Sequence, residues 1–153
     1  FEVILVAPAN YDYRPDFPNI RCIPVELNRS GLNPVKELLY MKTLYKIYRK
    51  EKPDYIFHYT IKPNIYGSIA ARLCHIPSTA MIAGLGFVFN KNGIGSLIAR
   101  GLYRFAMRFP EHIFVLNKSN RDVVLERHMA TSEQLILLSG GEGINLNKYQ
   151  ADV

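Results

Sequence analysis

A cluster of polar residues follows one short aromatic run near the middle of the chain. Residues 55–59, Tyr-Ile-Phe-His-Tyr, have the aromatic and β-branched composition of a strand. His58 lies at the expected tip of that strand, and Thr60, Lys62 and Asn64 follow it. Ligands of parallel sheets bind beyond the carboxyl ends of the strands. A lysine beside a hydroxyl group and a helix start suits a phosphate or a sugar oxygen, so these residues are candidate substrate contacts.

His58 is the candidate for catalysis, because an imidazole titrates near neutral pH and can act as a general base within hydrogen-bond reach of a substrate. A buried, hydrogen-bonded structural histidine is the alternative. Thr60 and Lys62 have a similar alternative, as a capping hydroxyl and a solvated cation.

Two glycines follow the next expected strand, residues 79–83. Gly84 and Gly86 permit close approach of a ligand to the backbone, and also positive φ. The segment lacks the third glycine of the dinucleotide-binding fingerprint, and no helix is expected to start there. We therefore expect a substrate-facing loop of another kind.

Two further candidates lie near the end of the chain. Asn117 follows an expected strand and precedes a helix, so it either caps that helix or faces a ligand. Residues 140–143, Gly-Gly-Glu-Gly, follow the last expected strand. This segment is expected to be a hinge, or a hinge in which Glu142 also lines a cleft.

The elements that position these residues alternate along the chain. Apolar runs predict strands at residues 3–6, 21–25, 55–59, 79–83, 112–116 and 134–138. Helices are predicted after Asn33-Pro34, after Lys62-Pro63, over residues 94–109 and from Asn117 or Ser119 to about His128. This alternation predicts a Rossmann-like, doubly wound α/β fold with a parallel sheet. The 153 residues correspond to one domain.

The helical periodicities predict which faces are buried. The first helix is expected to bury the stripe formed by Val35, Leu38, Leu39, Tyr45 and Tyr48. The helix over residues 94–109 is expected to bury Ile94, Leu97, Ile98, Gly101, Leu102, Phe105 and Phe109.

Three arginines repeat at every fourth position of that same helix. Arg100, Arg104 and Arg108, with Tyr103 and Met107, would then face outward. Such a face suits contact with anionic lipid headgroups, and an ordinary solvated surface is the alternative.

The composition limits the class of protein. A net charge of +6 and a pI near 9.4 indicate an anionic partner. The two cysteines, Cys22 and Cys74, are expected to be reduced thiols of a cytoplasmic protein. No Cys-His cluster or zinc-protease motif is present in the sequence, so no metal is expected.

Several segments resemble one enzyme family. Residues 58–72, His-Tyr-Thr-Ile-Lys-Pro-Asn-Ile-Tyr-Gly-Ser-Ile-Ala-Ala-Arg, and residues 84–89, Gly-Leu-Gly-Phe-Val-Phe, resemble the acceptor-side domain of family 4 glycosyltransferases. The nearest branch builds bacterial capsular polysaccharide and O-antigen. Residues 29–34, Arg-Ser-Gly-Leu-Asn-Pro, and 139–149, Ser-Gly-Gly-Glu-Gly-Ile-Asn-Leu-Asn-Lys-Tyr, agree with this family.

The resemblance implies one half of a two-domain GT-B enzyme. A strand, a glycine loop and a helix would precede Phe1, and a nucleotide-sugar domain would follow Val153, so the chain alone is expected to be inactive. The implied reaction transfers a sugar, with retention, from a nucleotide-sugar donor to a lipid-linked saccharide at the inner membrane face, without a cofactor. This chain departs from the family pattern at Ala83, where many members have a histidine, and at Glu142 and Asn145.

Two other functions are compatible with the pattern of elements. One is a non-enzymatic nucleotide- or nucleic-acid-binding module, although the base-stacking motifs of RNA-binding modules are not recognisable, so no nucleic-acid partner is expected. The other is a dinucleotide-dependent epimerase or dehydrogenase, against which the missing fingerprint counts.

Overall fold

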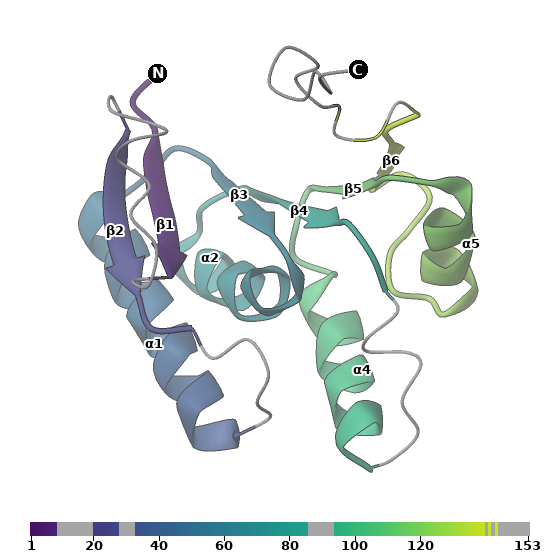
Figure 1. Cartoon of the computed structure of the whole chain (residues 1–153), viewed down its shortest axis with the longest axis horizontal. Helices are drawn as coiled ribbons and strands as arrows, with labels where there is room; N and C mark the ends of the chain where they lie inside the picture. The colour runs from purple at the N-terminus through teal and green to yellow at the C-terminus, as the bar shows by residue number, and fades with distance from the viewer. Residues whose placement is uncertain (9–19, 28–32, 86–93, 140, 142, 144–153) are drawn as a thin grey trace, which may run out of the picture.

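The fold consists of parallel strands and the helices that connect them (Figure 1). The computed structural model describes residues 1–8, 20–27, 33–85, 94–139, 141 and 143. Its elements in chain order are β1 (Ile4–Pro8), β2 (Arg21–Val25), α1 (Pro34–Glu51), β3 (Ile56–Tyr59), the π-helical turn η1 (Pro63–Gly67), α2 (Ser68–Cys74), β4 (Ser78–Ile82), α4 (Ile94–Ala106), β5 (His112–Val115), α5 (Lys118–Glu126) and β6 (Leu135–Leu137).

The described strands form two sheets. One contains β1 and β2, and the other has the order β3-β4-β5-β6. Every pair is parallel, with Phe57 opposite Thr79 and Ala80 opposite Ile113. The prediction of parallel, adjoining strands near residues 55–59, 79–83 and 112–116 is therefore confirmed. All five residues of β4 are buried, as expected for a strand with neighbours on both sides.

The sequence signals at the ends of α1 act as predicted. The Asn33 Oδ1 accepts hydrogen bonds from the amides of Val35 at 3.0 Å and Lys36 at 3.3 Å, and Pro34 occupies the first helical position. At the other end Lys52 has a φ of 47°, and its amide donates to the Tyr48 carbonyl. The helix therefore begins and ends where its local sequence specifies.

The buried face of α1 differs from the predicted one. Val35, Leu38 and Leu39 are exposed, whereas Glu37 and Tyr40 are buried. The prediction was wrong in the first two turns, because the side of the helix that faces the rest of the fold carries a carboxylate and a phenol there. Further along, Leu44 and Tyr48 are buried.

The buried face of α4 also differs from the predicted one. Tyr103 is 1% exposed, and Ala106 and the following Met107 are fully buried, so the expectation that Tyr103 and Met107 face outward was wrong. Leu97, Ile98, Gly101 and Phe105 are exposed, and Leu102 and Phe109 are half-buried. The helix is apolar on more than one side, and the side that carries Tyr103, followed by Met107, packs into the core.

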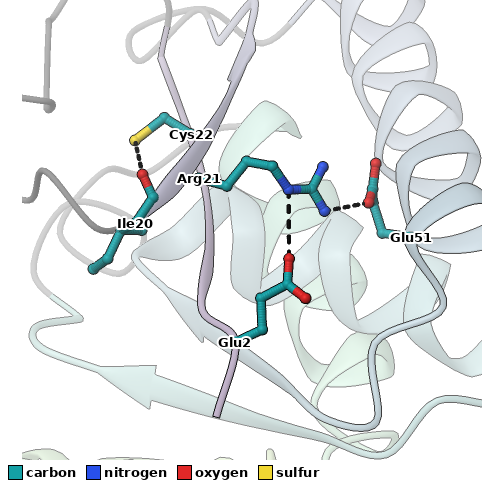
Figure 2. A network of polar contacts seen from close by, with 5 residues as sticks. All are labelled: Glu2, Ile20, Arg21, Cys22 and Glu51. Atoms are coloured by element: carbon teal, nitrogen blue, oxygen red, sulfur yellow. Dashed lines mark hydrogen bonds and ion pairs between the residues drawn. The ribbon is translucent and has the colours of Figure 1, made fainter.

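A polar network ties the amino ends of β1 and β2 to the end of α1 (Figure 2). The Arg21 guanidinium donates to the Glu51 carboxylate at 2.5 Å, and its Nε lies 3.7 Å from Glu2. These side chains are at the surface, so the network contributes little to stability beyond fixing orientation. It lies at the opposite ends of these strands from the carboxyl ends, where ligands of parallel sheets bind.

β3 and the helices approach each other closely at Gly67. A Cβ on Gly67 would lie 2.5 Å from Cδ2 and 2.7 Å from Nε2 of His58, and 3.2 Å from the Tyr48 hydroxyl. Since all three residues are buried, these groups have little room to move. A side chain at this position would push η1 and α2 away from β3.

We predict that Gly67→Ala lowers the free energy of unfolding by about 1–3 kcal/mol, because it overpacks a closed site. Gly101→Ala is the matched control: a Cβ there meets nothing within 4 Å, and alanine favours the helix. Urea unfolding of both variants checks this, and equal stability of the two would contradict the close packing.

Candidate substrate-binding site

A pocket of about 610 Å³ lies at the carboxyl ends of four strands. A volume of this size is typical of small-molecule sites. Its wall is formed by residues 6–8 of β1, Val25 and Leu27, Tyr40 of α1, residues 59–64, residues 81–84 and Tyr103 of α4. The pocket therefore lies where parallel sheets bind their ligands, and most of its lining is apolar.

Thr60 lies on the pocket wall in an unusual backbone conformation. Its φ is 74°, a left-handed value that is rare for a β-branched residue. Its carbonyl accepts a hydrogen bond from the Asn64 amide at 2.9 Å. Residues in such conformations are concentrated at functional sites, and here the conformation turns the chain from β3 into the pocket wall.

Lys62 provides the positive charge of the wall. Its Nζ donates to Glu37 Oε1 at 2.5 Å, and the side chains are only 15% and 9% exposed. Burial together with the Glu37 charge raises the pKa of the half-buried Tyr66 hydroxyl to about 12. The carboxylate thus holds the ammonium group in a fixed place at the edge of the pocket.

Asn64 is part of the same wall but is almost completely buried. Its amide nitrogen donates to the Met81 carbonyl at 2.7 Å and lies 3.4 Å from the Tyr103 hydroxyl. Its Oδ1 has no hydrogen-bond partner among the described residues. Buried acceptors of this kind are uncommon in folded proteins. Asn64 links β4 and α4 to η1, and so fixes the shape of the pocket.

The glycine and asparagine candidates differ in whether they line the pocket. Gly84 lines the pocket and is exposed, but it does not have positive φ, and nothing lies within 4 Å of an added Cβ. The positive φ that a glycine permits is therefore not used at Gly84. Gly86 and Glu142 lie outside the described residues. Asn117 caps α5 by accepting from the Asn120 amide at 2.7 Å and is absent from the pocket wall.

His58 does not reach the pocket. Its side chain is 2% exposed and lies between the Tyr48 hydroxyl, 3.2 Å from Nε2, and the Ser68 hydroxyl, 3.3 Å from Nδ1. The expectation that it lies at the crevice was wrong, because alternation along β3 turns it toward α1 and α2. Burial lowers its pKa to about 4, so it is neutral at physiological pH. The alternative given above, a buried and hydrogen-bonded structural histidine, therefore describes His58.

Arg100 and Arg104 of α4, and Arg108 just beyond its end, do not form one exposed stripe. Arg104 and Arg108 are exposed, and the Arg104 Nε donates to the His128 carbonyl at 3.1 Å. Arg100 is half-buried, and its Nε has no hydrogen-bond partner among the described residues. The prediction of a uniform arginine surface is thus wrong at Arg100. Among the described helices, none is both long and apolar enough to cross a bilayer.

Sequence reasoning missed three residues of the site: Glu37, Tyr40 and Tyr103. Glu37 was assigned no role because its partner, Lys62, is 25 positions away. Tyr40 and Tyr103 line the pocket from two different helices. A carboxylate on the otherwise apolar side of α1 was the one available signal, since a buried acidic residue requires a partner.

The parallel sheets with their flanking helices define an α/β domain of the kind found in GT-B enzymes, with a pocket at the carboxyl ends of the strands. The chain belongs to the Glycosyl transferase 4-like family, whose sequence profile matches residues 1–117. The resemblance noted in the sequence is thereby confirmed.

Two curated relatives agree with this membership. The chain is 27% identical to the N,N'-diacetylbacillosaminyl-diphospho-undecaprenol alpha-1,3-N-acetylgalactosaminyltransferase of Campylobacter jejuni, over 97% of this chain and 40% of the relative. It is 24% identical to the UDP-Gal:alpha-D-GlcNAc-diphosphoundecaprenol alpha-1,3-galactosyltransferase of Escherichia coli, over 90% of this chain and 35% of that protein. The chain thus spans less than half the length of either relative.

One solved structure shows the same fold. It is Anabaena Alr3699/HepE in complex with UDP and glucose, with a TM-score of 0.67 and 14% identity over 95% of this chain and 38% of that one. At this identity the likeness concerns the fold alone.

The buried imidazole leads to a prediction about stability and pH. The pKa of His58 is about 4 in the folded protein and about 6.5 when unfolded. Between these values the unfolded chain binds a proton that the folded protein does not, so the free energy of unfolding falls as pH drops from 6.5 to 4. The loss amounts to roughly 3 kcal/mol.

Urea unfolding at pH 4.5, 5.5 and 7 measures this loss. His58→Gln should remove the His58 part of the pH dependence, whereas His112→Gln, at an exposed position, should keep it. An unchanged pH dependence in His58→Gln would show that burial does not lower the pKa of His58 in the folded protein.

Proposed function

We propose that this chain is the acceptor-binding half of a bacterial glycosyltransferase that builds a surface polysaccharide. The enzyme transfers a sugar from a nucleotide-sugar donor to a saccharide carried on a lipid diphosphate. The family supports the reaction type. The names of both curated relatives contain a diphospho-undecaprenol acceptor, which supports the acceptor class.

The observation that carries the proposal is the buried Lys62–Glu37 pair at the edge of an otherwise apolar pocket. A cation fixed in this way suits a phosphate or a sugar oxygen. The aromatic side chains of Tyr40, Tyr59 and Tyr103 line the same pocket, and they offer flat apolar surfaces together with hydroxyl groups. This combination fits a saccharide attached to a phosphate.

The pocket wall indicates what this half contributes to the reaction. Among the described residues that form it, none is a histidine, an aspartate or a glutamate. The role assigned to the wall is therefore binding and orientation, which lowers the barrier by fixing the reacting groups. Lys62, together with groups of a domain that binds the nucleotide sugar, would stabilise the charge of the leaving diphosphate. Retention of the anomeric configuration is proposed on the family resemblance alone.

Two further parts are proposed for the complete enzyme. A strand between β1 and β3 would join the two described sheets, since β1 pairs only with β2 and β3 only with β4 among the described strands. A second domain would bind the nucleotide sugar, in keeping with the 40% and 35% of the relatives that this chain spans. The free thiols of Cys22 and Cys74 support a cytoplasmic location.

We predict that Lys62→Met in the full-length enzyme lowers kcat/KM at least tenfold, or about 1.4 kcal/mol. The variant removes the cation from the pocket wall. It also leaves the Glu37 carboxylate buried without its lysine partner, which costs up to roughly 3–5 kcal/mol of stability. Transfer from UDP-galactose and other UDP sugars to an undecaprenyl-diphosphate acceptor is the measurement.

The double variant Glu37→Gln/Lys62→Met separates the two effects. It should recover most of the lost stability, because no charge remains buried, but its activity should stay low. If the double variant transferred sugar at the wild-type rate, Lys62 would have a structural role only.

A second prediction concerns the isolated chain. The 153 residues alone should show no sugar transfer above background, because the proposed donor domain is missing. A rate close to that of the full-length enzyme, measured by release of UDP, would refute the proposed division into two halves.

A further inference from the structure

Asn64 contributes to the pocket wall a buried acceptor that no described residue uses. The residue is 1% exposed, and its Nδ2 donates to the Met81 carbonyl at 2.7 Å. This bond fixes the orientation of the carboxamide, because the opposite orientation would place Oδ1 against another acceptor. Oδ1 is buried without a hydrogen-bond partner among the described residues. An unpaired buried acceptor is unfavourable, so a ligand that supplies a donor at this position is bound more tightly.

Tyr103 offers a donor beside this acceptor. It extends from α4 to the same pocket and is 1% exposed. Its hydroxyl oxygen accepts from Asn64 Nδ2 at 3.4 Å, which leaves the hydroxyl proton free to be donated. Burial raises the pKa of Tyr103 to about 12, so the hydroxyl keeps this proton at neutral pH. The wall therefore presents an unused acceptor and an available donor next to each other.

The separation of these two groups limits what can meet both of them. Since Oδ1 and Nδ2 of a carboxamide are about 2.3 Å apart, Oδ1 lies no more than about 5.7 Å from the Tyr103 hydroxyl oxygen. One hydroxyl group that makes two hydrogen bonds of about 2.8 Å bridges oxygens about 4.6 Å apart at a tetrahedral angle, and up to about 5.6 Å apart in a straight line. A trans secondary amide holds its N–H and C=O on opposite sides and reaches only one of the two groups. A phosphate ion brings acceptors, which Oδ1 repels.

We propose that Asn64 and Tyr103 form a subsite for one hydroxyl group of the acceptor sugar. This hydroxyl donates to Asn64 Oδ1 and accepts from the Tyr103 hydroxyl. Because Oδ1 is itself buried, the contact forms with a small displacement of the surrounding wall. The subsite rests on the proposed function for the nature of the ligand, a sugar attached to a phosphate.

The subsite gives the ligand a direction in the pocket. Lys62 is at the edge, with its side chain 15% exposed, whereas Asn64 and Tyr103 are almost completely buried. The phosphate then stays at the edge and the sugar ring points inward. A site that hydrogen-bonds a substrate hydroxyl rejects an analogue without it, because the buried polar groups of the site are left unpaired. Asn64 and Tyr103 would therefore determine which sugars the pocket selects.

Binding of sugar phosphates to the full-length enzyme tests the subsite. The probes are glucose 1-phosphate, N-acetylglucosamine 1-phosphate and the monodeoxy derivatives of whichever of the two binds more tightly, each titrated by ligand-observed NMR. One monodeoxy derivative should bind at least tenfold more weakly than its parent, and the others within threefold. The proposal is overturned if neither parent binds, if every derivative binds like its parent, or if affinity depends only on the acetamido group.

Two variants connect this loss to the two side chains. Tyr103→Phe removes the hydroxyl group and keeps the ring in the core, and Asn64→Leu removes the acceptor. In each variant the parent sugar phosphate should bind at least fivefold more weakly. Removing the critical sugar hydroxyl should then change the affinity less than twofold, because its partner is already gone. A purely structural role would weaken binding of the parent and the derivative alike and keep the tenfold difference, which would overturn the proposal.

Tyr55→Phe is the matched control. It removes a tyrosine hydroxyl that hydrogen-bonds with Thr79 at 2.6 Å, away from the described pocket wall. This variant should keep the full discrimination between the parent and the deoxy derivative. Asn64→Leu also removes the donor to the Met81 carbonyl, so if that variant does not fold, Tyr103→Phe alone decides the outcome.

Transferase activity separates the subsite from the proposed function. If the sugar phosphates bind through the subsite but the full-length enzyme transfers sugar from no nucleotide-sugar donor, the proposed function is wrong and the subsite stands. If the enzyme transfers sugar to a lipid-linked acceptor while Tyr103→Phe keeps the tenfold discrimination, the subsite is wrong and the proposed function stands.

Discussion

The structure depends on the close contact between His58 of β3 and Gly67 at the end of η1. A Cβ at Gly67 would overlap the imidazole at 2.5 Å, so glycine allows the helix to approach the strand this closely. In that position the two imidazole nitrogens meet hydroxyl groups of Tyr48 on α1 and Ser68 on α2. A neutral imidazole needs one donor and one acceptor, and two hydroxyls satisfy it in either tautomer. One strand and two helices are thereby fixed together.

This contact also sets the geometry of the pocket. β3 ends at Tyr59, one residue after His58, and Thr60 turns the chain with a φ of 74° into the segment that carries Lys62 and Asn64. Because α1 is held against β3 through Tyr48, Glu37 is fixed on the same helix and meets Lys62 at 2.5 Å. A histidine that looks catalytic by its place in the sequence therefore positions residues of the pocket wall without itself lining the pocket.

The sequence predicted the positions of the helices and strands better than it predicted which of their faces are buried. Short aliphatic runs such as residues 3–6, and caps such as Asn33-Pro34, are local signals, and the strands and α1 lie where those signals place them. The buried side of α4 is a tertiary property, since the helix offers Leu97 and Ile98 on one side and Tyr103 and Met107 on another, and the neighbouring elements decide which is covered. The Lys62–Glu37 pair joins residues far apart in the chain, so no local pattern indicated it.

The Lys62–Glu37 pair also limits what the pocket can do for an anionic ligand. The Glu37 carboxylate, in contact with the Lys62 ammonium group, cancels much of its positive field beyond the immediate contact. Lys62 can therefore orient a phosphate at short range but attracts it weakly from a distance. On the proposed function, long-range attraction falls to cations without carboxylate partners in the described structure, such as Lys42, Lys46 and Arg108. On the same proposal, the positive net charge of the chain attracts the anionic acceptor, and the nearly neutral pocket selects it.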